Sequence, residues 1–289
     1  MCASAGSREH LTRRLCEGTP CVGWWSYPHQ RERRIVRIAR RKVEEFLWAI
    51  GLHSAARFLY QATPTGSSLK AHRRSIEQFY RPLLRPRSLV FDIGANVGVF
   101  SSIFASLDTK VIAVEPNADC VRHIQLCYPD IETIQAAVGI KNGLITLHIS
   151  DGLDELSSAS PAWIGAVQKE EGYGDIWKRH MTVPEVTLDA LIEHYGDPDY
   201  IKIDVEGFEE EVLGGLSRQP NLLSFEFHTD CLDAALRCVD RFDHTSGYNF
   251  AFEDPIRFEL SNWVDHVQIK KALNWVGTHR YGDVFVIKR

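Results

Sequence analysis

Residues 90–98 read Val90-Phe91-Asp92-Ile93-Gly94-Ala95-Asn96-Val97-Gly98, and this stretch decides the fold. An apolar run of strand type ends in a glycine-rich turn, and a helical pattern follows over residues 97–107. Glycines at such a junction let the backbone approach a ligand closely, and the helix that follows presents unpaired N–H groups. The stretch therefore predicts a ligand site at this strand-to-helix turn.

The turn lacks the spacing of a dinucleotide site. A G-x-G-x-x-G pattern needs glycine where Asn96 stands, and the last glycine is at the wrong distance. The carboxylate of Asp92 would repel a pyrophosphate but suits an ammonium group. Glu115 follows 23 residues later, at the end of the next predicted strand, where an acid can bind both hydroxyls of a ribose. Because ammonium, carboxylate and ribose together describe S-adenosylmethionine, we expect this cofactor rather than the NAD of an oxidoreductase.

Strands and helices alternate from residue 88 onward. This order is typical of an α/β domain with a doubly wound, mostly parallel sheet, which we expect to have seven strands. An added hairpin strand is expected at residues 144–149, and a long irregular loop at 150–180. The aromatic-rich segment 163–177 within that loop is the predicted determinant of acceptor selectivity. The seven strands are expected at residues 88–93, 110–115, 132–138, 200–205, 222–228, 248–252 and 284–287.

Three sequence blocks in order resemble the FkbM family of Rossmann-type S-adenosylmethionine-dependent methyltransferases. The blocks are residues 90–98, residues 114–117 (Val-Glu-Pro-Asn) and residues 201–209 (Ile-Lys-Ile-Asp-Val-Glu-Gly-Phe-Glu). The resemblance implies methyl transfer to an oxygen of a sugar, glycolipid or polyketide hydroxyl. It also implies that Glu115 binds the ribose, that Pro116 borders the adenine and that Asp204 contacts the methionine part or the substrate. The other cofactor-binding residues implied are Asp92, Gly94, Ala95, Asn96 and Gly98 for the methionine part, with Ala136 and Ala137 for the adenine.

Polar side chains interrupt two strands that should be neighbours in the sheet. Alternation places Lys202 and Asp204 on one face of the fourth strand, and Glu226 and His228 on one face of the fifth. A lysine and a glutamate inside central strands are not expected to be unpaired, so we predict a buried Lys202–Glu226 ion pair. In a functional interpretation, the same pair positions the acceptor or His228.

A hydroxyl acceptor must lose a proton during methyl transfer, so the site needs a base. His228, at the end of the fifth strand, is the predicted base, with Asp204 and Glu206 as rivals. Glu206 is equally suited to complement the dipole of the helix that follows. No group of His, Asp or Glu residues has metal-ligand spacing in the sequence, which predicts metal-independent chemistry.

The charges divide the chain into a basic arm and an acidic body. Residues 1–87 carry 17 Lys and Arg against 6 Asp and Glu, whereas residues 88–289 carry 16 against 32. We expect a poorly ordered tail at 1–30, a basic helical extension at 31–80 and the methyltransferase domain at 81–289. The amphipathic pattern of residues 31–52 fits either packing on the body or peripheral contact with an anionic membrane. The acidic body disfavours a nucleic-acid methyltransferase, although the basic arm keeps that alternative open, together with a non-catalytic cofactor-binding scaffold.

Targeting signals and cysteines point to a cytoplasmic location. No signal-peptide pattern opens the chain, and the longest uncharged stretch, residues 93–107, is shorter than the roughly 20 residues that span a bilayer. The seven cysteines form no C-x-x-C pair, which is consistent with a reducing compartment.

Overall fold

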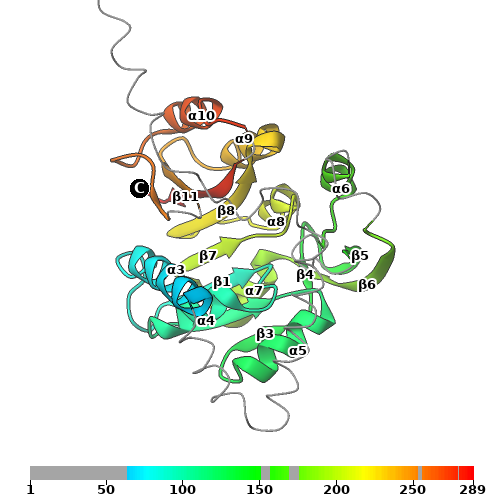
Figure 1. Cartoon of the computed structure of the whole chain (residues 1–289). Helices are drawn as coiled ribbons and strands as arrows, with labels where there is room; N and C mark the ends of the chain where they lie inside the picture. The colour runs from blue at the N-terminus through cyan, green and yellow to red at the C-terminus, as the bar shows by residue number, and fades with distance from the viewer. Residues whose placement is uncertain (1–63, 151–156, 169–175, 253–255, 279) are drawn as a thin grey trace, which may run out of the picture.

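A computed structural model describes residues 64–150, 157–168, 176–252, 256–278 and 280–289 (Figure 1). The tail predicted at 1–30, the basic helix predicted at 31–52 and part of the aromatic-rich segment 163–177 lie outside these ranges. The first described element is α3 (Pro64–Tyr80). Among the described helices, none combines the length and the hydropathy needed to cross a membrane.

An eight-stranded sheet forms the centre of the described part of the chain, in the order β10-β9-β11-β8-β7-β1-β2-β3. Five adjacent strands, in the order β8-β7-β1-β2-β3, run parallel to one another. Beyond β8, the strands β11, β9 and β10 pair antiparallel. The predicted α/β fold with a mostly parallel sheet is confirmed, and the two-residue β10 adds an eighth strand. The strands are β1 (Leu89–Ile93), β2 (Lys110–Val114), β3 (Glu132–Ile134), β7 (Tyr200–Ile203), β8 (Leu222–His228), β9 (Gly247–Phe252), β10 (Arg257–Phe258) and β11 (Tyr281–Ile287).

A second, three-stranded sheet lies at one side of the main sheet (Figure 1). It joins β4 (Ala137–Val138), β5 (Gly143–Ile149) and β6 (Arg179–Val186), with β6 in the middle. The strand expected at 132–138 is therefore two strands that belong to different sheets. The loop expected at 150–180 contains the helix α6 (Pro161–Val167), which begins after the N-cap Ser160.

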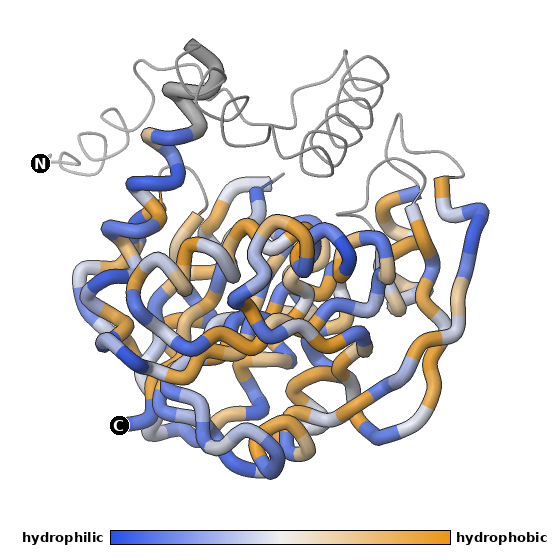
Figure 2. The backbone as a smooth tube through the Cα atoms, turned by 90° about the horizontal axis from the view of Figure 1, so that it is seen from below, coloured by the Kyte–Doolittle hydropathy of each residue, from blue (hydrophilic) through white to orange (hydrophobic). Residues whose placement is uncertain are grey.

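Helices cover both faces of the main sheet. On one face, α3 packs with α4 (Val99–Ser106) and α5 (Ala118–Cys127), and Tyr80 of α3 is fully buried there. A domain boundary after residue 80 would separate α3 from the predicted methyltransferase domain, although α3 packs against α4 of that domain. Hydrophobic and hydrophilic stretches alternate along the backbone (Figure 2), and the inner strands contribute buried apolar side chains to both faces of the sheet. The other face is covered by α7 (Leu188–Tyr195), α8 (Glu209–Gly214), α9 (Leu232–Val239) and α10 (His266–Asn274).

Candidate active site at the carboxyl ends of the central strands

The turn after β1 brings two strand ends into backbone contact. Gly94 has a φ of 80°, and a Cβ there would lie 1.7 Å from the carbonyl oxygen of Asp204. Gly98, with a φ of 79°, begins α4, and a Cβ there would lie 2.9 Å from the side chain of Ile124. Asn96 also has a positive φ, 48°, a conformation that asparagine adopts more readily than most residues. The turn therefore depends on the residue types at these positions, because a side chain at 94 or 98 would displace its neighbours.

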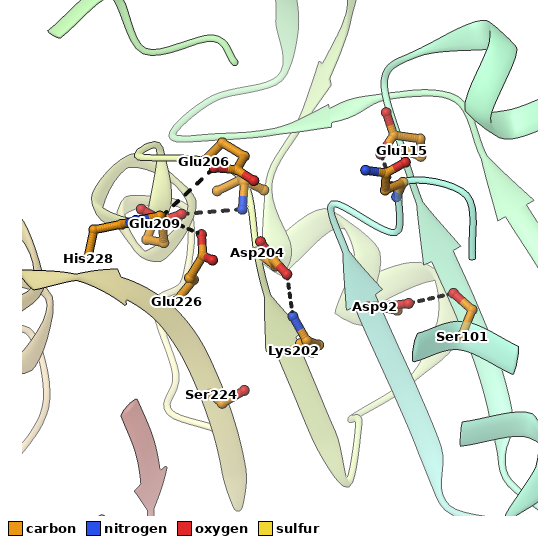
Figure 3. A network of polar contacts seen from close by, with 12 residues as sticks. Asp92, Ser101, Glu115, Lys202, Asp204, Glu206, Glu209, Ser224, Glu226 and His228 are labelled. Carbon is orange, nitrogen blue, oxygen red and sulfur yellow. Dashed lines mark hydrogen bonds and ion pairs between the residues drawn. The ribbon is translucent and has the colours of Figure 1, made fainter. Parts of the chain in front are cut away.

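Glu115 joins the end of β2 to this turn. Its two carboxylate oxygens accept hydrogen bonds from the backbone N–H groups of Asn96 and Asn117, each at 2.8 Å. Ala95, inside the turn, is buried, and its N–H donates to the carbonyl oxygen of Val114 at 3.2 Å. The structure thus places the acid predicted for the ribose directly beside the glycine turn (Figure 3).

The residues predicted to border the adenine lie beyond the ends of β2 and β3. Pro116 follows Glu115 directly, and Ala136 and Ala137 are both buried. The backbone N–H of Glu115 donates to the carbonyl oxygen of Ile134 at 3.0 Å and so holds the two strand ends together. These residues form one neighbourhood, and their contact with adenine stays a prediction.

One face of the central strands carries charged side chains instead of an apolar core. The strand register places Asp92 beside Lys202, and Lys202 beside Ser224. Across the pair of β8 and β11, Glu226 lies opposite Asp283. Asp92 and Lys202 are each 1% exposed, so these charges are removed from water. Such charges require partners within the fold.

Lys202 supplies positive charge to the middle of this face. Its Nζ lies 2.6 Å from Oδ2 of Asp204 and 4.4 Å from the centroid of the Phe100 ring. Burial by itself would lower the pKa of Lys202, but Asp204, Asp283 and Asp92 raise it well above the usual value. Lys202 is therefore a cation at neutral pH.

The predicted Lys202–Glu226 ion pair is wrong. Lys202 lies directly across from Ser224, so Glu226 is two residues further along β8. Asp204, just after β7, is near enough to pair with the lysine, and Glu226 instead contacts His228. The sequence pattern placed all these groups on one face correctly, but the partners depended on the strand register.

Two further carboxyl groups on this face have contrasting environments. Asp92 accepts a hydrogen bond from the Ser101 hydroxyl, and burial raises its pKa while Lys202 partly opposes the rise. Burial also raises the pKa of Asp283, to about 6, and no hydrogen bond from the described residues reaches its carboxylate. Sequence reasoning missed both Ser101 and Asp283. Asp283 is a charged residue in the otherwise apolar strand β11, and a charged residue inside a central strand is also the signal that identified Lys202.

His228 stands at the end of β8 among acidic and aromatic side chains. Its Nε2 lies 3.1 Å from Oε2 of Glu226 and 3.9 Å from Oε2 of Glu206. Its ring stacks with Tyr281 at a centroid distance of 5.9 Å and meets Trp163 edge-on at 6.3 Å. Burial would lower the pKa of His228, but Glu226 and the other nearby acids raise it to about 9. The imidazole is therefore protonated at neutral pH in the protein alone.

A strained turn between β7 and α8 presents Glu206 to this histidine. Glu206 and Gly207 both have positive φ, 55° and 82°. Oε1 of Glu209 accepts hydrogen bonds from the N–H groups of Val205 at 3.2 Å and Gly207 at 3.1 Å, which braces the turn. Burial and a neighbouring carboxylate raise the pKa of Glu209 to about 8. Sequence reasoning did not assign Glu209 to the site, although it belongs to the block at residues 201–209.

The strand order, the glycine turn after β1 and the acid at the end of β2 define a Rossmann-like methyltransferase fold with its site at the carboxyl ends of the strands. Residues 92–245, more than half of the 289-residue chain, match the family described as methyltransferase FkbM domain. The chain belongs to this family, and S-adenosylmethionine is its methyl donor.

Among curated proteins, the chain is similar to the hexuronic acid methyltransferase AglP of Haloferax volcanii. The two are 28% identical over 139 residues, which cover 47% of this chain and 53% of the relative. The chain thus matches about half the length of that relative.

Solved structures with a similar outline include a TehB-like S-adenosylmethionine-dependent methyltransferase from Corynebacterium glutamicum. The TM-score is 0.36 at 12% identity, over 82% of this chain and 100% of the other. A precorrin-6y C5,15-methyltransferase from Geobacter metallireducens has a TM-score of 0.36 at 12% identity, over 75% and 86% of the two chains. Such scores describe a loose likeness, and the strand order itself defines the fold.

The residues around the turn fit S-adenosylmethionine. At Gly94 the backbone of two strand ends meets without room for a side chain, which keeps the ends of β1 and β7 close together. The acids at the ends of β1 and β7 suit a donor that carries positive charge, and the contact of Glu115 with a ribose stays a prediction.

Proposed function

We propose that this protein transfers a methyl group from S-adenosylmethionine to a hydroxyl oxygen of a sugar, glycolipid or polyketide-like acceptor. The observation that carries the proposal is the pair of Glu226 and His228, set between two aromatic side chains at the end of β8. A hydroxyl acceptor needs both a surface for its apolar face and a group that takes its proton.

The donor side of the site is assigned to the turn after β1. Asp92, Asn96 and the backbone at Gly94 would hold the methionine part, and Glu115 the ribose. When bound, the donor supplies a methyl group on a positively charged sulfur. The contribution of this chain is to hold the acceptor oxygen in line with that group, because alignment can provide effective molarities on the order of 10⁵ M or more.

The acceptor side is assigned to the aromatic side chains around His228. Trp163 from α6 and Tyr281 from β11 flank its ring, and Trp177 packs edge-on against Trp163 at 6.2 Å. Aromatic faces beside convergent polar groups suit a ring that has both C–H and O–H groups. The relative from Haloferax volcanii, described as a hexuronic acid methyltransferase, supports a carbohydrate acceptor.

Proton removal is assigned to the group at the ends of β7 and β8. His228 remains the predicted base, in its neutral form only, which is the minor form at neutral pH because its pKa is raised to about 9. The rivals Asp204 and Glu206 lie in the same group of acids. Glu226 positions the imidazole through its 3.1 Å contact. Lys202 positions Asp204 in the same manner, at 2.6 Å.

The test is a mass-spectrometric assay for a gain of one methyl group. The full chain and S-adenosylmethionine are incubated with neutral hexosides, uronic acids, a glycolipid and a polyketide-type alcohol. Glu226→Gln is expected to lower turnover while calorimetry shows unchanged S-adenosylmethionine binding. Glu210→Gln, on the exposed side of α8 where it pairs with Arg237, is the matched control and should keep full turnover.

Three results would contradict the proposal. Methylation of nitrogen or of an RNA substrate would assign a different acceptor class. Donor binding with no methyl transfer to any hydroxyl would favour a cofactor-binding scaffold. Full turnover of Glu226→Gln would remove the pair with His228 from the reaction.

A further inference from the structure

Three metal-ligand atoms converge where β7 and β8 end (Figure 3). They come from Glu206, Glu226 and His228 and lie within 4.8 Å of one another. The imidazole Nε2 is 3.1 Å from one carboxylate oxygen and 3.9 Å from the other. Around a metal ion with bonds of about 2.0–2.2 Å, ligand atoms are separated by about 3 to 4 Å. The two separations from the imidazole fall in this range, and the two carboxylates lie within 4.8 Å of each other.

The donor set is mixed and comes from two separate elements. Glu206 lies in the turn after β7, whereas Glu226 and His228 lie two residues apart on one face of β8. The turn is held by the Ser158 hydroxyl, which donates to the carbonyl oxygen of Glu206 at 2.7 Å. Two carboxylates with one imidazole suit Mn²⁺ or Zn²⁺, since carboxylate favours the first and imidazole the second.

Glu226 is the more buried of the two carboxylates in this group. Its side chain is only 10% exposed, and one oxygen, Oε2, contacts His228. Glu209, 7% exposed, adds a further buried carboxyl group beside it.

The charge of the neighbourhood also favours a cation. The buried or half-buried acids outnumber the two basic groups, and Lys202 is already paired with Asp204. Among the described residues, His228 is the basic group that pairs with Glu226 at the end of β8. The acids on this side of the sheet are Asp92, Asp204, Asp283, Glu206, Glu209 and Glu226.

We propose that Glu206, Glu226 and His228 bind one divalent transition-metal ion. Binding itself does not depend on the proposed function; only its role does. Beside the acceptor, such an ion would polarise the hydroxyl and lower its pKa. The sequence predicts metal-independent chemistry because Glu206 is 20 positions from Glu226, and only the parallel pairing of β7 and β8 brings them together.

The experiment is a titration of the chelator-treated full chain with Mn²⁺, followed by electron paramagnetic resonance and by calorimetry. One Mn²⁺ per chain is expected. Glu226→Gln and His228→Gln are each expected to weaken binding by about tenfold or more. Glu210→Gln and His194→Gln, which change the same residue types outside the group, should bind as the wild type does. Circular dichroism and S-adenosylmethionine binding of each variant establish that it is folded.

Two results would overturn the inference. One is the absence of Mn²⁺ binding, and of Zn²⁺ binding, at up to about 1 mM. The other is equal binding by the wild type and by folded Glu226→Gln and His228→Gln, which would place the ion elsewhere. Methyl transfer to a hydroxyl without any bound ion would refute the ion's role but leave the proposed function intact. Bound Mn²⁺ with no transfer to any hydroxyl would leave the metal site intact but refute the proposed function and, with it, the ion's role in the reaction.

Discussion

Replacing Lys202 by methionine tests whether one buried cation holds the polar face of the sheet together. Lys202 is 1% exposed, and its Nζ lies 2.6 Å from Asp204. Asp92 and Asp283 also act on it electrostatically. Methionine keeps most of the length and volume of the side chain but leaves these three carboxyl groups without their cation. Breaking a buried pair by removing one partner costs about 3–5 kcal/mol, and we expect a loss of this size in the free energy of unfolding at pH 7.5.

The loss should depend on pH in a defined direction. The folded-state pKa of Lys202 is raised, so its stabilising effect is complete below its unfolded pKa and is lost only at higher, strongly alkaline pH. Between pH 5 and 8 the wild-type lysine is therefore charged throughout. In the variant, the pKa values of Asp92 and Asp283 should rise further, since Lys202 lowers both in the wild type. As the pH falls, these groups take up protons and the uncompensated charge disappears, so the deficit should shrink at pH 5.5.

The assay is urea denaturation followed by circular dichroism at pH 7.5 and 5.5. The control is Arg218→Met, which removes an exposed ion pair with Asp197 and should cost no more than about 1 kcal/mol. A deficit for Lys202→Met no larger than that of the control, or one equal at the two pH values, would refute the electrostatic account. S-adenosylmethionine binding of the variant, measured by calorimetry, shows whether the site survives.

Three further outcomes are expected. Gly94→Ala should abolish S-adenosylmethionine binding in calorimetry, because its Cβ would lie 1.7 Å from the carbonyl oxygen of Asp204. The control Gly165→Ala, whose Cβ would have nothing within 4 Å, should bind S-adenosylmethionine normally. Equal affinities of the two variants would disprove the role of the turn. Asp283→Asn should stabilise the protein by up to about 3 kcal/mol at pH 8 and little at pH 4. An acid whose pKa is raised to about 6 on folding destabilises the fold increasingly as the pH rises through that value, and unchanged urea midpoints at both pH values would contradict this. His228→Asn should retain S-adenosylmethionine binding and lose most turnover in the mass-spectrometric assay, and full activity would exclude this residue as base or ligand.

The strand pattern was readable from the sequence where local signals agree. An apolar run, the turn at Gly94 and the following helix appear where predicted, because only glycine tolerates a positive φ against a neighbouring backbone. Thr187 caps α7 as its position indicates, with its side chain accepting from the N–H of Ala190. The split of residues 132–138 into β3 and β4 was not readable, because the two strands are separated by two residues only and are distinguished by the sheets to which their partners belong.

Side-chain alternation placed the polar groups on one face, but it did not determine their contacts. Period-two alternation depends on one strand alone, so the polar faces of β7 and β8 followed from the sequence. The relative shift of the two strands depends on packing across the whole sheet. Because of that shift, Lys202 pairs with Asp204 and Glu226 contacts His228, whereas the sequence pattern favoured a Lys202–Glu226 pair.

The sequence by itself determined the class of protein: an α/β methyltransferase domain with a glycine turn, an acid for the ribose and a row of acids at the strand ends. These features are local, since each depends on residues a few positions apart. Only the tertiary structure decided which distant side chains meet, because the ends of parallel strands gather residues that are far apart in the chain. It placed Glu206 beside Glu226 and His228, buried Asp283 opposite Glu226, and thereby joined the predicted acceptor site to a group of metal-ligand atoms.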